Sequence, residues 1–210
     1  MIFNFQKIVK QYNINIKGVI HVGAHYGNEY EFYKNTNIKN MLFFEPLQNN
    51  YKKLITNVPQ TENIVLVNKA LGNENKKVIM YVESDNEGQS SSILKPKLHT
   101  QQYSHIVFDK QEEVDMIILD EFLEKQYSNR FEKFNFINID VQGYEMEVFK
   151  GSKNTLQHID YIISEVNRAE LYENNTIVYD LDKYLKQYGF ERVETIWEGI
   201  TWGDALYVKK

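Results

Sequence analysis

The sequence contains no cysteine, only three prolines and only three arginines among its 210 residues. The absence of cysteine excludes disulfide scaffolds, thiolate zinc sites, iron–sulfur clusters and cysteine nucleophiles. Any chemistry must therefore use oxygen, nitrogen or a bound cofactor. With 42% apolar and 25% charged residues, the composition also excludes collagen-like and mostly disordered classes. The length fits one folded domain.

The charge balance gives no sign of a nucleic-acid partner. The net charge is −5, and nearly all basic residues are lysines, whereas nucleic-acid binders usually show a basic patch and contact phosphates and bases through arginine. No apolar stretch approaches the ~20 residues that span a membrane, and residues 1–7 lack the pattern of a signal peptide. We therefore expect a cytoplasmic protein without a nucleic-acid partner or a membrane span. The sequence does not indicate an oligomeric state.

Short apolar runs alternate with helical patterns along most of the chain, which is typical of βαβ units in an α/β fold with a mostly parallel sheet. Residues 1–17 are predicted to contain an N-terminal helix, and we find no internal repeat or linker, so a single domain over 1–210 is expected. The predicted strands are 18–22, 41–44, 64–67, 76–83, 114–118, 136–139, 160–166, 190–197 and 205–208. The predicted helices that follow them are 27–35, 46–57, 119–126, 144–157 and 177–188.

Residues 84–104 are polar, rich in serine and without a clear period. A stretch of this length inside a compact domain is either functional or mobile, and we expect it to form a lid on the substrate side. Its Ser90 and Ser91 offer neutral hydrogen bonds, and Trp202 near the end of the chain offers a stacking face. A binding site lined by these side chains suits a polyhydroxylated substrate.

A glycine turn and an acidic residue follow the first two predicted strands. The turn is Gly23-Ala24-His25-Tyr26-Gly27, and Glu45 lies 18 residues after it, close to the spacing of an acid that holds ribose hydroxyls. The carboxyl ends of the strands are where ligands bind in open α/β sheets. Because His25 stands where a dinucleotide fold needs a glycine beside the pyrophosphate, the pattern favours a nucleoside cofactor without a diphosphate. S-adenosyl-L-methionine fits this description.

Several further motifs occur in order over residues 18–208. They are Phe44-Glu45-Pro46, Lys69-Ala70-Leu71-Gly72, Ser90-Ser91-Ser92, Leu119-Asp120-Glu121-Phe122-Leu123, Asp140-Val141-Gln142-Gly143-Tyr144-Glu145 with Phe149-Lys150-Gly151, and Trp202-Gly203-Asp204-Ala205-Leu206-Tyr207. Together with the first turn they resemble the FkbM family of S-adenosylmethionine-dependent methyltransferases. The resemblance implies a class I methyltransferase fold, a Rossmann-like three-layer sandwich whose seven-stranded, mostly parallel sheet has an antiparallel last strand.

The resemblance also implies a set of cofactor-binding residues. These are Gly23, Ala24 and Gly27 at the methionine and ribose, Glu45 at the ribose, and Ala70 and Leu71 beside the adenine. His25, in the same turn, and Asp140, at a strand end near the methyl donor, are further candidates for binding the cofactor. The chain departs from the family at His21, where many members carry an aspartate that helps to hold the amino group of the cofactor. A neutral His21 could accept the same hydrogen bond, whereas a charged one would oppose the ammonium.

The acidic strand ends allow two mechanisms for methylating a hydroxyl. Asp140 could act as the general base, with Glu145 one helical turn later orienting it or the acceptor. Alternatively, Asp140, Glu165 and Asn167 could hold Mg²⁺, an oxygen-only set that suits a hard cation. Glu165 therefore counts among the catalytic candidates and Asn167 among those for the substrate. His25 and His99 are further candidate bases, although a histidine in a turn or polar loop is usually exposed.

The favoured hypothesis is an S-adenosylmethionine-dependent O-methyltransferase that acts on a hydroxyl of a sugar, nucleotide sugar or glycan. The family resemblance points to sugar, glycan and polyketide-type acceptors, and a small-molecule or glycan hydroxyl is the expected partner. One alternative is an NAD(P)-dependent oxidoreductase on the same βαβ unit, which would need a glycine triplet that is missing here. The other is a non-catalytic nucleotide-binding module, which does not predict that Glu45, Asp140 and Glu165 are all retained.

Overall fold

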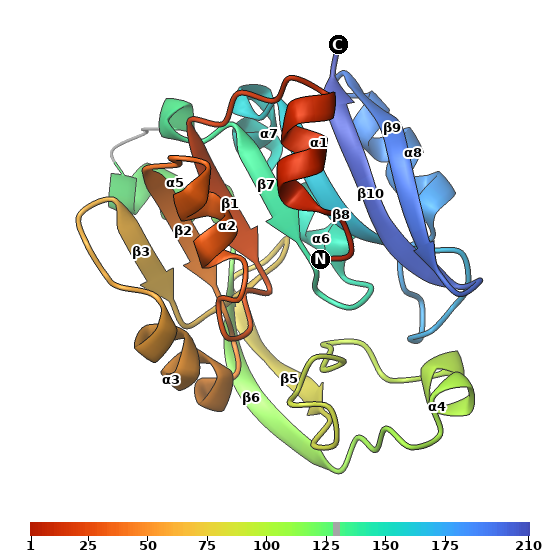
Figure 1. Ribbon diagram of the computed structural model, residues 1–210. Coiled ribbons are helices and arrows are strands. Elements are labelled where there is room, and N and C mark those ends of the chain that lie inside the picture. The colour runs from red at the N-terminus through yellow and green to blue at the C-terminus, as the bar shows by residue number, and fades with distance from the viewer. Residues whose placement is uncertain (128–130) are drawn as a thin grey trace.

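The computed structural model describes residues 1–127 and 131–210, and it is built around a seven-stranded sheet (Figure 1). The strand order is β3-β2-β1-β7-β8-β10-β9. Its strands are β1 (Gly18–Val22), β2 (Asn40–Phe44), β3 (Ile64–Val67), β7 (Phe136–Ile139), β8 (Tyr161–Asn167), β9 (Phe190–Glu198) and β10 (Trp202–Lys209). Neighbours from β3 to β8 pair in parallel, whereas β10 is antiparallel to both β8 and β9. This confirms the expected mostly parallel sheet with an antiparallel last strand.

Helices cover both faces of this sheet and make it the middle of three layers (Figure 1). One face is covered by α1 (Phe5–Gln11), α2 (Tyr30–Asn35) and α3 (Gln48–Asn57). The other is covered by α5 (Leu119–Tyr127), α6 (Glu145–Lys150), α7 (Lys153–His158) and α8 (Val178–Lys186), with the 3-10 turn η1 (Phe131–Lys133) nearby. The longest described helix, α3, has ten residues, and no described helix has the length and apolarity to cross a membrane.

The prediction of a single helix over residues 144–157 is wrong, because the structure has two helices there, α6 and α7. Gly151 marks the break, and a Cβ at this position would lie 2.0 Å from the carbonyl oxygen of Gly72. Only glycine permits this close approach. The carbonyl oxygen of Gly151 also accepts a hydrogen bond from Asp120 N at 3.1 Å, at the start of α5.

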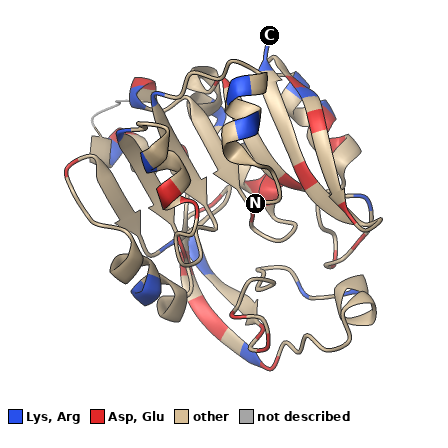
Figure 2. Cartoon of the chain, in the orientation of Figure 1, with Lys and Arg blue, Asp and Glu red and all other residues tan. Residues whose placement is uncertain are grey.

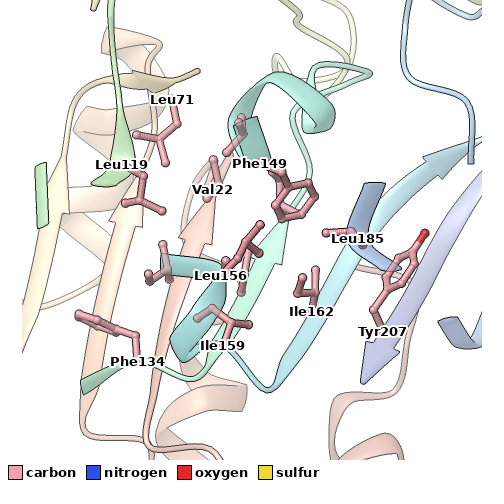
Figure 3. Packing of buried hydrophobic residues seen from close by; sticks show 14 of the residues in the cluster. Val22, Leu71, Leu119, Phe134, Phe149, Leu156, Ile159, Ile162, Leu185 and Tyr207 are labelled. Carbon is pink, nitrogen blue, oxygen red and sulfur yellow. The ribbon is translucent and has the colours of Figure 1, made fainter. Parts of the chain in front are cut away.

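Each central strand buries side chains on both faces, which explains why the strands appear as unbroken apolar runs. In β1, Ile20 and Val22 belong to a cluster with α5–α8, whereas Val19 belongs to a cluster with α1–α3. Figure 3 shows the first cluster, where Phe149 of α6 and Leu156 of α7 pack over the sheet. The two clusters fix the position of the strand ends, at which the polar residues lie.

A second sheet of three strands projects from the carboxyl ends of the first (Figure 1). Its order is β4-β6-β5, with β4 (Ala70–Leu71), β5 (Lys76–Val82) and β6 (Lys110–Ile117). Strand β6 starts four residues before the predicted start at 114, because its first residues pair with the last four residues of β5. The segment between β5 and β6 contains α4 (Leu98–Gln102) and the expected lid residues.

Replacing Leu156 with alanine is expected to lower the free energy of unfolding by about 2–5 kcal/mol, because Leu156 is fully buried and the change leaves a cavity. Denaturant titration followed by circular dichroism measures the difference. The matched control is Ile200→Ala at a side chain that is 79% exposed, for which the change should stay within about 0.5 kcal/mol. Equal losses in both variants would contradict this assignment of the core.

Candidate active site

The turn after β1 brings three strand ends together. The amides of Gly23 and Ala24 both donate to the carbonyl oxygen of Phe44, at 3.0 and 2.9 Å. Gly23 has φ +79°, and a Cβ there would lie 1.9 Å from the carbonyl oxygen of Asp140. Glycine is required at this position both by the backbone conformation and by the approach of β7. Gly27, at φ +77°, packs against Val58 instead.

Glu45 lies directly after β2 with both carboxylate oxygens fixed by backbone amides. Oε2 accepts from His25 N at 2.8 Å and Oε1 from Leu47 N at 3.0 Å. Burial raises the pKa of Glu45 to about 7, and the two amide bonds oppose that shift. Each oxygen keeps a lone pair for a ligand hydroxyl.

A pocket lies over these strand ends and contacts most of the predicted cofactor residues. Gly27 does not line it. Apolar residues that sequence reasoning missed, Leu47, Met80, Ile93 and Tyr144, add walls around Ala70 and Leu71. The predicted residues that line the pocket are His21, Gly23, Ala24, His25, Glu45, Ala70, Leu71 and Asp140.

His21 is a buried neutral imidazole whose two ring nitrogens already have partners inside the protein. Nδ1 lies 3.4 Å from Tyr33 Oη, and Nε2 lies 3.2 Å from Asn138 Nδ2. Burial lowers the pKa of His21, so the ring stays uncharged. The ring therefore lines the pocket without opposing a cationic group there.

A carboxyl pair connected by one amide lies at the ends of β7 and β8. Gln142 Nε2 donates to Asp140 Oδ1 at 2.7 Å and to Glu165 Oε2 at 2.6 Å. Burial, followed by the charges of Asp140 and Glu145, raises the pKa of Glu165 well above its ordinary value. Glu165 is therefore the member of the pair that favours the protonated form, in which its hydroxyl donates to Asp140.

Two more buried acids complete the cluster. Glu145 accepts from Gly143 N at 3.1 Å and from Val141 N at 3.2 Å, and burial raises its pKa to about 7. Asp204 lies opposite Glu165 across the β8–β10 pair and accepts from Ile2 N. Burial raises the pKa of Asp204 to about 6. Glu145 holds the turn that presents Asp140.

A second cavity, of about 500 Å³, adjoins the first. Asp140, Gln142 and Asp204 line both. Of the predicted substrate residues, Ser90 and Trp202 line the second cavity and Ser91 lines the first, while Asn167 is fully buried and lines neither. Asp140 therefore lies at the boundary between the two.

Residues 84–104 lie over both cavities through three sets of contacts. His25 Nε2 and Tyr26 Oη lie 2.8 and 3.1 Å from the carbonyl oxygen of Glu87. Ser92 Oγ donates to the carbonyl oxygen of Gln142 at 2.8 Å. Trp202 Nε1 donates to Tyr103 Oη at 2.8 Å. These contacts attach the segment to the first turn, to the β7 end and to β10.

Two expectations about histidines are corrected here. His99 is only 5% exposed and lines the second cavity, because Tyr103, Phe108 and Tyr172 surround its ring. His25 does not have a free ring, since it stacks on Tyr26 and bonds the backbone of Glu87.

A family model described as a methyltransferase FkbM domain matches residues 21–192. The chain belongs to the FkbM methyltransferase family. Among curated proteins it is 27% identical over 162 residues to NoeI, a 2-O-methyltransferase of Sinorhizobium fredii, a match that covers 74% of this chain. The FkbM chain spans 65% of the length of that relative.

Solved structures share the fold at low identity. One is Sp1610 of Streptococcus pneumoniae, proposed to be a tRNA (m1A22) methyltransferase and solved with S-adenosyl-L-methionine. It has a TM-score of 0.54 and 15% identity, and the match covers all of this chain and 73% of that one. Another is magnesium protoporphyrin IX methyltransferase of Synechocystis, with a TM-score of 0.50, 8% identity, and coverage of 98% and 76%. The FkbM chain therefore has the class I methyltransferase fold.

The Mg²⁺ alternative does not fit the FkbM site. Asn167 is fully buried and lines neither cavity, and its Nδ2 lies 3.2 Å from Glu165 Oε1, so the three proposed ligands do not face one common space. Within residues 1–127 and 131–210, no group of three histidine, aspartate or glutamate side chains is placed to hold a metal ion.

Sequence reasoning assigned no role to three residues that organise the FkbM site. Gln142 and Asp204 stand inside the motifs Asp140–Glu145 and Trp202–Tyr207, so their place in those motifs was the available signal. Tyr172 had none. Its hydroxyl donates toward Gln142 Oε1 and the carbonyl oxygen of Ser90, at 2.8 Å each.

The buried carboxyls should make this protein less stable as pH rises. Their pKa values are raised on folding, so the folded state binds more protons than the unfolded state and stability falls from about pH 5 upward. Over the pH range in which folded wild type keeps Glu165 protonated, the free energy of unfolding of Glu165→Gln should rise relative to that of the wild type by about 1.4 kcal/mol per pH unit. Denaturant unfolding at pH 5, 6.5 and 8 measures this, with the exposed Glu198→Gln as control. If the difference in the free energy of unfolding between Glu165→Gln and wild type does not change with pH, Glu165 is not protonated in the folded state.

Proposed function

We propose that this chain is an S-adenosylmethionine-dependent O-methyltransferase acting on a hydroxyl of a sugar, nucleotide sugar or glycan. The observation that carries the proposal is the position of Asp140, which lines both the pocket of predicted cofactor residues and the adjoining cavity. A carboxylate at such a boundary can contact an acceptor hydroxyl on one side while a methyl donor lies on the other.

The first pocket fits S-adenosylmethionine by the chemistry of its walls. Glu45 presents two amide-anchored oxygens for the ribose hydroxyls, and Ala70, Leu71, Leu47 and Met80 give apolar contacts for a base. The neutral His21 leaves the cofactor's ammonium unopposed. The structure of Sp1610 with S-adenosyl-L-methionine supports this choice for the shared fold.

When bound, S-adenosylmethionine supplies an electrophilic methyl group on a sulfonium. The role of the protein is to align the acceptor and to receive its proton. Asp140 accepts the hydroxyl proton as general base, held in place by Gln142 Nε2. Glu165, protonated and hydrogen-bonded to Asp140, orients that carboxylate. Glu145 acts one step further out by fixing the backbone of the turn.

The name of NoeI, a 2-O-methyltransferase, supports oxygen as the acceptor atom. The polar second cavity, with Ser90 and Trp202, favours a polyhydroxylated acceptor. The absence of a nucleic-acid partner stays a prediction, because a fold shared with a proposed tRNA methyltransferase does not decide the substrate. The His25 side chain in the first turn argues against the NAD(P) alternative. The intact carboxyl cluster argues against the binding-module alternative.

Asp140→Asn should abolish methyl transfer, because an amide cannot take the proton, while the Kd for S-adenosylhomocysteine changes less than about threefold. Mass spectrometry of acceptors and isothermal titration calorimetry give the two readouts. The exposed Asp180→Asn serves as control. Transfer by Asp140→Asn at near wild-type rate would reject the base. Since the metal set does not fit, EDTA should leave the rate of the wild type unchanged.

Cofactor affinity should fall as the medium becomes acidic. Ribose hydroxyls bind the ionised form of Glu45, whose pKa is about 7, so the Kd for S-adenosylhomocysteine should rise about tenfold between pH 8 and pH 6. Glu45→Gln should bind more weakly at pH 8 and lose most of this slope, whereas the exposed Glu62→Gln should keep it. An unchanged slope in Glu45→Gln would show that another group is responsible.

A further inference from the structure

We propose that the second cavity takes a hydroxyl acceptor bearing no phosphate or carboxylate, and that it discriminates against phosphorylated sugars, nucleotide sugars included. This inference rests on the proposed function and narrows its substrate class. It follows from the charges that line the cavity, from what each charge is bonded to, and from an unpartnered imidazole within it.

The ionisable side chains that line the second cavity are carboxylic acids, imidazoles and the phenol of Tyr103. The acids are Asp85, Asp140, Glu165 and Asp204, and the histidines are His99 and His105. Among the described residues no lysine or arginine side chain lines it. The α-amino group of Met1 also borders the cavity, and it pairs with Glu29 Oε1 at 3.4 Å. Figure 2 shows acidic segments gathered near the N-terminus, at the ends of the strands.

The acids in the cavity are held by uncharged donors rather than by side-chain cations. Asp85 Oδ2 accepts from Val107 N at 2.9 Å, and Asp204 accepts from Ile2 N. Asp140 and Glu165 share the amide of Gln142. Because Glu165 is the protonated member of that pair, the negative charge in the cavity comes from Asp85, Asp140 and Asp204, and no lysine or arginine among the described lining residues cancels it. Since the α-amino group of Met1 is paired with Glu29, a phosphate in this cavity would face mainly negative charge.

The basic residues of the segment above the cavity are directed to other partners. Lys95 Nζ lies 3.4 Å from Glu173 Oε1, and Lys97 pairs with Glu170. Neither lysine lines the cavity. They therefore do not provide the phosphate contact that a nucleotide-sugar acceptor would need.

His99 supplies the second observation that points to a ligand. Its side chain lines the cavity and is nearly fully buried, yet Nδ1 has no hydrogen-bond partner in the described part of the chain. Burial lowers the pKa of His99, so the ring is neutral and has one donor and one acceptor. A hydroxyl has the same pair of functions, and an anion has only acceptors. The imidazole therefore matches a polyol better than a phosphate.

The test compares four probe acceptors in the presence of S-adenosylmethionine: methyl glucoside, glucosamine, glucose 6-phosphate and UDP-glucose. Methyl transfer is followed by mass spectrometry. We expect kcat/KM for the best uncharged or amine-bearing probe to exceed that of either phosphorylated probe at least about tenfold. Asp85→Asn, which keeps an oxygen for Val107 N, should narrow this gap several-fold. Asp109→Asn, at an exposed position just before β6 and outside the cavity lining, should leave the gap unchanged.

The outcomes separate the two proposals. Equal or better transfer to UDP-glucose or glucose 6-phosphate would overturn the inference and leave the methyltransferase function standing. No transfer to any probe would count against a sugar acceptor, and the inference would then be decided by titrating the same probes onto the complex with S-adenosylhomocysteine. There, tighter binding of either phosphorylated probe than of methyl glucoside, or no binding of methyl glucoside and glucosamine, would overturn it.

Discussion

The site depends on burying several carboxyl groups together at the ends of the strands, with no lysine or arginine from residues 1–127 or 131–210 among them. Such a cluster is costly because each charge loses water and repels the next. The structure meets the cost in two ways. Glu165 keeps its proton, and Gln142 divides its two amide hydrogens between Glu165 and Asp140. One carboxylate can then remain at the boundary of the two cavities, with its orientation fixed from both sides.

The same glutamine connects the strand ends to the segment above them. Its side-chain oxygen accepts from Tyr172 Oη, and its backbone oxygen accepts from Ser92 Oγ. Tyr172 also donates toward the carbonyl oxygen of Ser90. The left-handed backbone of Gln142, with φ +54°, makes these contacts compatible. The residue that orients the carboxyl pair therefore also anchors the wall of the acceptor cavity, which ties substrate contact to the geometry of the base.

The sequence predicted the central strands of the main sheet well because they are buried on both faces, and continuous apolar runs such as 41–44 follow directly from that burial. The first glycine turn and Glu45 were predictable for a similar reason, since the turn needs glycine at position 23. Tertiary contacts decided the rest. The helix break at Gly151 reflects the approach of a distant backbone, and the early start of β6 reflects pairing with β5. His99 stands in a polar stretch, and nothing local shows that Tyr172 and Phe108 will bury it.

The segment of residues 84–104 forms a wall of both cavities, so neither can change independently. Gly88, Gln89 and Ser91 line the first cavity, while Ser90 and His99 line the second. The tip of the segment is fixed to the first turn, where His25 and Tyr26 both contact the carbonyl oxygen of Glu87. Because His25 N also anchors Glu45, a shift of this turn on binding a nucleoside would be transmitted to the segment that borders the acceptor. The cofactor pocket and the acceptor cavity are thus connected through one short stretch of backbone.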